Sequence, residues 1–292
     1  MLPKTAGLFD VVVIDEASQM LPEMAVASIL RGKQTVVVGD DKQMPPSSFF
    51  KVKSNEDADD EDTEIESESI LDLASGRFTE KAVLRWHYRS KHESLIKFSN
   101  HHFYKNMLEV IPSAESPGEG LGLEHIKVEG AYKGGLNLPE ANALIRAVRR
   151  FMVKFPHRSI GIVAMNSSQR ELIEEELLRL ADTDPEVRSY FDRWNDSVLD
   201  YPMVRSLERV QGDERDTIFI STVYGPDPDG KMFQRFPLIN TDYGHRRLNV
   251  LFTRARRKIF LVTSMNPSDI VLSDTAKFGK KALRDYIEYA AT

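Results

Sequence analysis

Two runs of β-branched aliphatic residues near the start of the sequence predict strands that each end in polar residues. The first run, Val11–Ile14, leads directly into Asp15 and Glu16. We interpret it as a buried parallel strand with both carboxylates at its carboxyl end. The second run leads into a polar segment that begins at Gly39, and a short helix is predicted between the two runs. This order fits one right-handed strand–helix–strand unit, so we expect the two polar strand ends to meet at one phosphate.

Strand-like and helix-like segments alternate along almost the whole sequence, which is typical of the α/β class with parallel sheets. Strands are predicted at residues 9–15, 34–39, 81–86, 123–128, 159–164, 204–207, 217–223 and 258–263. Helices are predicted at residues 22–30, 69–74, 94–103, 140–154, 168–181, 246–253 and 276–290. The remaining polar and aromatic stretch, residues 182–201, is expected to be an excursion from this pattern.

The distribution of strands predicts two domains. The strands before residue 79 are too few for an independent sheet of this class, whereas those after it are enough for a whole domain. A sequence of 292 residues is also long enough for two domains with a core each. We therefore predict one domain over residues 1–78 and a second over residues 79–292.

Composition excludes several classes of protein. The hydrophobic content of 41% and the charged content of 29% are ordinary for a soluble globular protein. The longest apolar runs have the length of strands, and the first residues contain no apolar signal core, so we expect no membrane span, no secretory leader and a cytoplasmic setting. The absence of cysteine excludes disulfides, thiol nucleophiles and cysteine-ligated zinc.

The net charge of −6 comes from one segment. Residues 55–68 contain nine acidic residues and no basic residue, and without them 39 basic residues face 36 acidic ones. A groove for nucleic acid is therefore compatible with the charge of the rest of the chain. We interpret the acidic segment, taken as residues 53–68, as a solvated loop; a mimic of nucleic acid that occupies the groove is the alternative.

The acidic pair after the first strand suggests nucleotide chemistry. In nucleotide hydrolases this position binds Mg²⁺ and polarises the attacking water. A strand followed by the polar start of a helix would give the same sequence pattern and is the alternative. A phosphate loop needs Gly-x-x-x-x-Gly-Lys-Ser/Thr, and the 292 residues contain no such stretch. Arg31–Thr35 has the wrong glycine spacing and precedes a strand. The sequence thus predicts the back part of a nucleotide-driven motor.

Six segments in order resemble the helicase motifs of superfamily 1, branch B, the group that includes the nonsense-mediated-decay helicase. They resemble motifs II, III, IV, IVa, V and VI and are, in that order, Asp15–Gln19, Gly39–Pro46, Leu84–Ser90, Ser159–Asn166 with Gln169, Val210–Asp216 and Arg247–Arg257. Each segment alone is a weak or moderate signal, but six in the right order at plausible spacing are a strong one. Together they cover nearly the whole chain. The acidic segment, Trp86–Ser90 and Gln211–Asp216 are most similar to large bacterial multidomain helicases with an AAA-type ATPase domain.

The resemblance implies a RecA-like P-loop NTPase fold and roles for residues of the first domain. Residues 1–78 would be the carboxyl-terminal part of a first RecA-like domain, and residues 79–292 a complete second one. By resemblance, Asp15 would bind Mg²⁺ and Glu16 would position or deprotonate the attacking water. Gln43 would sense the γ-phosphate and link its state to the nucleic acid.

The resemblance also assigns roles in the second domain. Tyr88 would stack on the adenine, Arg89 would reach the γ-phosphate, and Arg254 would be a second arginine finger. The residues that would line the nucleotide cleft and couple it to nucleic acid are Gln211, Gly212 and Glu214.

Plainer interpretations stay open for several of these residues. Tyr88 and Trp86 have the character of core aromatics, as does Phe103. Gln211 and Gly212 are compatible with a simple turn. The arginines from 254 to 257 fit the exposed end of a basic helix, and we favour that surface or groove role for Arg256 and Arg257.

The resemblance implies the carboxyl-terminal motor portion of an ATP-dependent helicase or translocase that uses ATP and Mg²⁺. Its partner would be single-stranded nucleic acid, with DNA favoured over RNA. Without a phosphate loop we expect no hydrolysis by this chain alone, and we expect an amino-terminal RecA-like segment to be supplied in cis or in trans. A non-catalytic module that binds nucleic acid or protein is the alternative.

Overall fold

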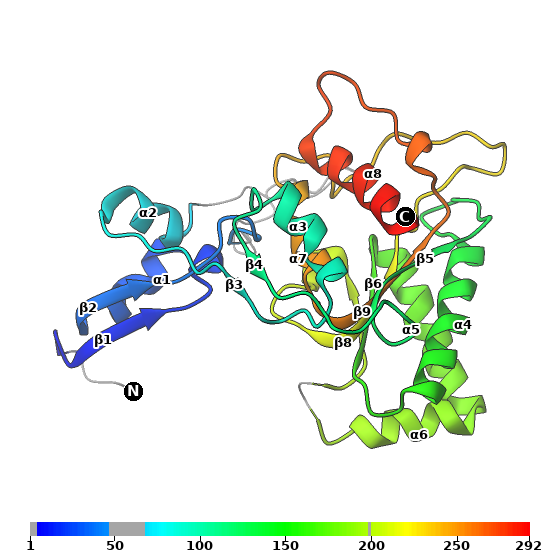
Figure 1. The fold of residues 1–292 in the computed structure, drawn as a ribbon, viewed down its shortest axis with the longest axis horizontal. Helices are drawn as coiled ribbons and strands as arrows, with labels where there is room; N and C mark the ends of the chain where they lie inside the picture. The colour runs from blue at the N-terminus through cyan, green and yellow to red at the C-terminus, as the bar shows by residue number, and fades with distance from the viewer. Residues whose placement is uncertain (1–4, 47–67, 198–199) are drawn as a thin grey trace, which may run out of the picture. The chain divides into compact units, whose positions relative to one another are not determined.

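The chain divides into two compact units, which we call unit 1 (Met1–Leu84) and unit 2 (Arg85–Thr292) (Figure 1). A computed structural model describes residues 5–46, 68–197 and 200–292. The acidic loop predicted over residues 53–68 therefore lies outside the described residues except for Glu68. The division between the units falls a few residues after the predicted domain boundary.

The described part of unit 1, residues 5–46 and 68–84, contains one parallel strand pair and two helices. β1 (Phe9–Ile14) and β2 (Gly32–Val37) pair in parallel, and the 3₁₀ turn η1 (Ala17–Gln19) and helix α1 (Pro22–Ile29) connect them. Helix α2 (Ile70–Arg77) follows, and Ser69 and Asp72 form a capping box at its start. The predicted strand–helix–strand unit is confirmed.

The prediction that the first strand is buried is wrong for one of its faces. Side chains alternate between the two faces of a strand. Val12 and Ile14 pack with residues of α1 and α2 in the core of unit 1. Val11 and Val13 point the other way and are 47% and 61% exposed. In the described part of unit 1, apolar packing therefore covers a single face of β1.

Unit 2 is built on a parallel sheet of five strands in the order β5-β9-β8-β6-β7. The strands are β5 (Gly122–Lys127), β6 (Ile160–Ala164), β7 (Met203–Ser206), β8 (Arg215–Ser221) and β9 (Ala255–Thr263). All residues of β6 are buried, as expected for a strand with covered faces. The predicted α/β class with parallel sheets is confirmed.

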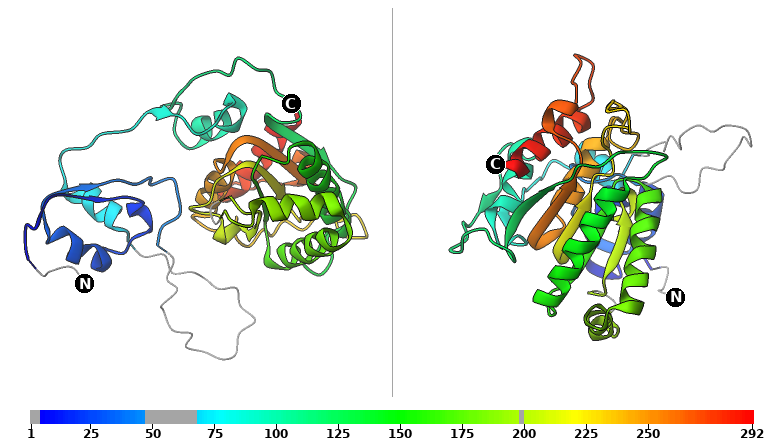
Figure 2. Two further views of the ribbon diagram at one scale, coloured as in Figure 1. Left: turned by 90° about the horizontal axis from the view of Figure 1, so that it is seen from below. Right: turned by 90° about the vertical axis from the view of Figure 1, so that its right-hand side faces the viewer.

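Helices cover both faces of this sheet. Figures 1 and 2 show α4 and α5 on one face and α3 and α7 on the other, with α8 packed against α7. The helices of unit 2 are α3 (Lys97–His102), α4 (Leu138–Lys154), α5 (Ser167–Thr183), α6 (Pro185–Trp194), α7 (Gly244–Phe252) and α8 (Phe278–Ala291). Short 3₁₀ turns are η2 (Glu93–Leu95), η3 (Leu207–Arg209) and η4 (Pro267–Asp269). Among residues 5–46, 68–197 and 200–292, no helix is both long and apolar enough to span a membrane.

The strand predicted at residues 81–86 is wrong. In the region of residues 81–87, the strand that forms is β3 (Trp86–His87), which has two residues. It pairs with β4 (Glu109–Val110). Val83 and Leu84 are 64% and 82% exposed, so these apolar residues do not lie in a packed sheet. Trp86 is also mainly exposed, which contradicts its prediction as a core residue, whereas Phe103 is buried as predicted.

The excursion predicted over residues 182–201 contains a helix. The Asp184 carboxylate accepts hydrogen bonds from the amides of Glu186 and Val187, and Pro185 follows the cap directly. This is a standard helix start. The helix, α6, buries Val187 and Tyr190, so its few apolar residues lie on one face.

Candidate functional site

The polar ends of β1 and β2 lie at the same edge of the strand pair in unit 1. The two strands pair in register up to Ile14 and Val37. Beyond them the ladder continues, because the Val38 amide donates to the Ile14 carbonyl at 2.8 Å and the Ala17 amide donates to the Val38 carbonyl at 2.9 Å. The structure therefore brings the segment that starts at Asp15 next to the segment that starts at Gly39.

Local hydrogen bonds fix the predicted first-domain residues at this edge. The Asp15 carboxylate accepts the Glu16 amide at 2.9 Å, and Glu16 adopts a left-handed conformation with φ 51°. The Gln19 amide group donates to Glu16 at 3.0 Å. On the neighbouring segment, Nε2 of Gln43 donates to Asp40 at 3.1 Å. Both carboxylates of the acidic pair are exposed, so they are accessible to a ligand.

The donor set at this edge fits Mg²⁺. This ion commonly uses one or two protein carboxylates and completes its shell with water and substrate phosphates. Asp15 and Glu16 are such carboxylates at the end of a strand, and the buried Oε1 atom of Gln43 has no hydrogen-bond partner among the described residues. The described part of the chain contains no group of three or more metal-binding side chains.

Gly39 keeps the two segments in contact. A Cβ atom at this position would lie 3.0 Å from Leu71 Cδ2, 3.1 Å from the Ser18 amide nitrogen and 3.3 Å from the Ala17 amide nitrogen. We expect Gly39→Ala to destabilise the strand pair by about 1–3 kcal/mol, as overpacking does. Hydrogen exchange at the Ala17 and Val38 amides would measure this change.

Gly76 provides the matched control for that prediction. It lies in α2, and a Cβ atom there would have no neighbour within 4 Å. Alanine is the better helix former, so Gly76→Ala should slow exchange or leave it unchanged. Equal exchange rates in the Gly39 variant and the unsubstituted chain would contradict the close-contact argument.

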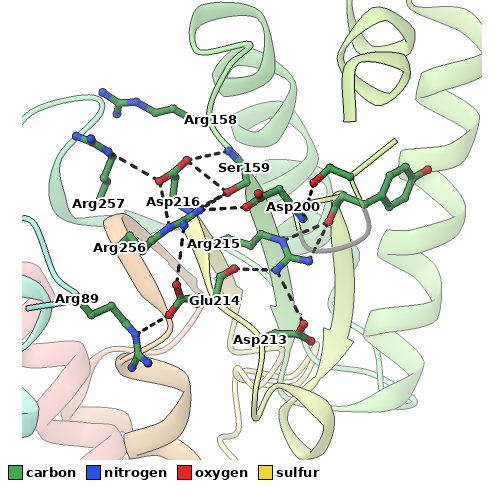
Figure 3. A network of polar contacts seen from close by, with 12 residues as sticks. Arg89, Arg158, Ser159, Asp200, Asp213, Glu214, Arg215, Asp216, Arg256 and Arg257 are labelled. Carbon is green, nitrogen blue, oxygen red and sulfur yellow. Dashed lines mark hydrogen bonds and ion pairs between the residues drawn. The ribbon is translucent and has the colours of Figure 1, made fainter. Parts of the chain in front are cut away.

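In unit 2, charged residues gather at the amino ends of the sheet strands (Figure 3). We call Arg89, Asp200, Glu214, Asp216 and Arg256 the amino-edge cluster. Asp200 precedes β7, and Arg256 lies at the start of β9. Glu214 and Asp216 lie at the start of β8. Arg89 comes from the segment after β3.

Glu214 joins the two arginines of the amino-edge cluster. Nε of Arg89 donates to Glu214 Oε2 at 2.8 Å, and Arg256 lies 3.9 Å from Glu214 Oε1. Arg256 also pairs with Asp200 at 3.1 Å and with Asp216 at 3.3 Å. The sequence interpretation of Arg256 as a surface or groove residue missed this role at the centre of an ion-pair network.

The second predicted arginine finger has a different environment. Arg254 is 3% exposed, and its Nε donates to the Val250 carbonyl at 3.0 Å. Its own carbonyl accepts the Arg215 amide at 3.2 Å at the start of β8. The structure thus places Arg89 beside Glu214 and places the Arg254 side chain among buried atoms.

The remaining predicted nucleotide residues lie on loops. Tyr88 is 77% exposed, so its alternative interpretation as a core aromatic is wrong. Gly212 lies in a turn with φ 85°, a conformation that favours glycine. Gln211 precedes it, and its buried Nε2 has no hydrogen-bond partner among the described residues. Their assignment to a nucleotide cleft stays a prediction.

A second polar cluster lies at the opposite, carboxyl ends of the strands, and sequence reasoning missed it. At its centre, Glu140 of α4 is fully buried. Its Oε1 accepts the Ser221 hydroxyl at 2.7 Å and the Val223 amide at 2.6 Å, and its Oε2 accepts the Ser264 amide at 3.0 Å and hydroxyl at 3.1 Å. One carboxylate therefore ties the start of α4 to the ends of β8 and β9.

This cluster contains a buried acid and a strained backbone. Burial disfavours the charged carboxylate more than the hydrogen bonds favour it, so the pKa of Glu140 is raised to about 7. Val223 has φ 68°, which is unusual for a β-branched residue. Such strain persists only where the surroundings enforce it, and here Glu140 accepts the hydrogen bond of the strained amide.

Part of this cluster had a readable signal. Asn137 caps α4 by accepting the Glu140 amide at 3.2 Å, and Pro139 lies in the first helical turn. An asparagine followed three residues later by glutamate predicts a helix start. Nothing in that pattern shows that the glutamate turns into the core.

Comparisons with known proteins agree with these observations. A family model described as an AAA domain matches residues 67–266, and a second model with the same description matches residues 2–50. The chain is 31% identical over 298 residues to an uncharacterised ATP-dependent helicase of Mycoplasma genitalium, covering 99% of the chain and 26% of that protein. It is 24% identical to the helicase sen1 of Schizosaccharomyces pombe, covering 88% of the chain and 15% of that protein.

Among solved structures, the chain is similar to an arterivirus nonstructural protein 10 helicase in complex with DNA. The TM-score is 0.37 with 11% sequence identity, and the match covers 86% of this chain and 39% of the viral chain. The chain spans about a quarter of the length of the Mycoplasma relatives that it matches.

Proposed function

The chain belongs to the AAA domain family and is a motor portion of the superfamily 1 helicase type, and from this premise we propose that it takes part in ATP-driven movement along single-stranded nucleic acid. The observation that supports the proposal most is in unit 1. There, two strand ends place Asp15 and Glu16 beside the segment of Asp40 and Gln43 at one edge. Carboxylates and an amide at the end of parallel strands are suited to the reacting phosphate of a nucleotide.

Unit 1 would bind and orient the reacting groups. In this proposal, Asp15 would hold Mg²⁺, which when bound would supply positive charge beside the phosphates, and Glu16 would accept a hydrogen bond from the attacking water. Gln43 contacts the γ-phosphate through its amide and transmits the loss of that contact through its bond to Asp40. These roles rest on the accessible carboxylates and on the hydrogen bonds at the edge.

Unit 2 would supply cationic stabilisation and adenine binding. We propose Arg89 as the residue that stabilises charge on the transferred phosphoryl group and Arg254 as a second arginine with the same function. A planar guanidinium suits this purpose, because phosphoryl transfer depends on positioning and charge stabilisation. The exposed ring of Tyr88 would stack on the adenine, and Gln211, Gly212 and Glu214 would complete the nucleotide contacts.

The absent phosphate loop supports a second candidate function for the chain taken alone. Without that loop's amides and lysine, the chain lacks the groups that cradle the phosphates. A module that binds nucleic acid without hydrolysis fits this absence. Such a module has no need for Glu16 or Arg89, so we favour the motor function, with the phosphate loop supplied by residues outside these 292.

We predict that the purified 292-residue chain hydrolyses no ATP, whereas the intact protein that includes it hydrolyses ATP faster when single-stranded nucleic acid is present. A phosphate-release assay with and without DNA and RNA oligonucleotides would measure both rates. Glu16→Gln is the matched control, since it keeps the size of the side chain and removes the acid. Hydrolysis by the chain alone that depends on Glu16 would refute this proposal.

A further inference from the structure

The turn that presents Arg89 is closed by a histidine. Nε2 of His87 lies 3.1 Å from the Ser90 amide nitrogen and 2.9 Å from the Ser90 hydroxyl. A backbone amide is always a donor, so Nε2 must be the acceptor and the ring proton must be on Nδ1. The His87 side chain therefore closes residues 87–90 into a turn, and Arg89 lies within that turn.

The surroundings of His87 keep its imidazole neutral. The ring is half-buried, and burial, followed by the positive charge of Arg89, lowers the pKa of His87 to about 4. At neutral pH the ring is thus available as an acceptor.

A second contact anchors the same turn to the sheet. The Lys91 amide donates to the Arg256 carbonyl at 2.7 Å, which ties the end of the turn to the start of β9. From this fixed turn, Nε of Arg89 reaches Glu214 at 2.8 Å. The direction of the Arg89 side chain therefore depends on a turn that is closed by His87 and anchored to the sheet at Lys91.

We propose that His87 is a positioning residue for Arg89: by accepting the Ser90 amide, it sets the turn that directs the guanidinium toward Glu214 and toward the phosphate. The last part of this inference rests on the proposed function of Arg89. His87 itself touches no reacting group. Its part in catalysis is exerted through Arg89 alone.

Three variants distinguish the effect of the hydrogen-bond acceptor of His87 from the effect of its side-chain size. His87→Phe keeps a ring and removes the acceptor, whereas His87→Gln keeps an acceptor at nearly the distance of Nε2. The matched control is His125→Phe, because His125 is also half-buried and its Nε2 has no hydrogen-bond partner among the described residues. Each variant is prepared in the 292-residue chain and in the intact protein.

The first measurement uses nuclear magnetic resonance on the 292-residue chain. In His87→Phe, exchange of the Ser90 amide should rise about tenfold, as expected for the loss of one hydrogen bond, and the Nε–H signal of Arg89 should move. His87→Gln and His125→Phe should leave both signals nearly unchanged. An Arg89 signal that is the same in His87→Phe as in the unsubstituted chain would overturn the proposal.

The second measurement is a double-mutant cycle on kcat in the intact protein. His87→Phe should lower kcat about tenfold with little change in the KM for ATP, and it should have no effect when Arg89 is already alanine. A further fall in the Arg89→Ala background would mean that His87 acts elsewhere, against the proposal. If the intact protein hydrolyses no ATP, the proposed function fails, while the signals of Ser90 and Arg89 still decide the role of His87.

Discussion

Replacing Arg89 with alanine is expected to lower kcat for ATP hydrolysis by the intact protein about 10³-fold or more. Arginine fingers contribute on the order of 10³–10⁵ to the rate in phosphoryl transfer because they neutralise charge that develops on the phosphate oxygens. Arg89 fits this role best, since its guanidinium lies on a fixed turn, is partly exposed, and is bound only through Nε to Glu214 among the contacts described. Its terminal nitrogens are the groups that a phosphate would engage.

The design separates loss of the finger from loss of binding. Steady-state kcat and KM would be measured beside the affinity for a single-stranded oligonucleotide, which should change little. Arg89→Lys keeps the charge but not the planar fork, and we expect it to recover only part of the rate. Arg193→Ala on α6 removes an exposed arginine far along the chain and should retain full activity. An Arg89→Ala protein with unaltered kcat would rule out the finger assignment.

Arg254 needs a different reading of the same experiment. We expect Arg254→Ala to abolish hydrolysis with strand binding largely intact, but its side chain is buried and bonded to Val250. Truncation there removes packing as well as charge. Thermal unfolding of the Arg254→Ala variant must therefore be measured in parallel. A loss of activity supports a catalytic role for Arg254 only if the variant retains its fold.

Patterns of residue type and spacing correctly predicted the strands and helices that pack against elements close to them in the sequence. The runs that end at Ile14 and Val38 became β1 and β2 because β-branched residues favour strands, and their spacing left room for one helix. The strand predicted at residues 81–86 failed because an apolar sequence forms a strand only beside a partner, and β4 offers two residues for pairing. The helix α6 had its cap in the sequence, at Asp184 and Pro185, yet its polar composition hid it.

The candidate site was predictable only where its residues follow each other along the chain. Asp15 and Glu16 were recognised as a motif, and the parallel pairing of β1 and β2 explains why Gln43 lies at the same edge. The link between Arg89 and Glu214 joins residues far apart in the sequence, so no periodic pattern reveals it. The burial of Glu140 depends on the ends of two other strands and was equally invisible.

The free energy of unfolding of the chain is expected to fall by about 3 kcal/mol through Glu140 as the pH rises from 4.5 to about 7. Burial raises the pKa of this acid above its ordinary value of 4.5. Between the two values the unfolded chain has released the proton and the folded chain retains it. The folded state binds more protons than the unfolded state in this range. The stabilisation by Glu140 is therefore complete below pH 4.5 and is lost as the pH rises past the pKa of Glu140 in the folded chain.

A matched pair of variants isolates this contribution. Glu140→Gln cannot ionise, so denaturant unfolding from pH 5 to 8 should show a stability curve without the Glu140 slope. Glu186→Gln removes an exposed carboxylate of α6 and should keep the slope of the unsubstituted chain. The quantity compared is the difference in unfolding free energy between each variant and the unsubstituted chain at each pH.

The Gln variant should also be less stable at every pH below 7, for a geometric reason. The two carboxylate oxygens of Glu140 each accept a backbone amide, from Val223 on one side and from Ser264 on the other. Either orientation of the new amide group turns its NH₂ toward one of these N–H groups, which costs about 1–3 kcal/mol for an unsatisfied buried donor. If the curves of unfolding free energy against pH were parallel for the variant and the unsubstituted chain, the hydrogen-bond donors around Glu140 would stabilise its charged form more than burial destabilises it. Glu140 would then stay ionised. In that case the strained conformation of Val223 would be held by a permanent charge rather than by a carboxyl group that changes state near neutral pH.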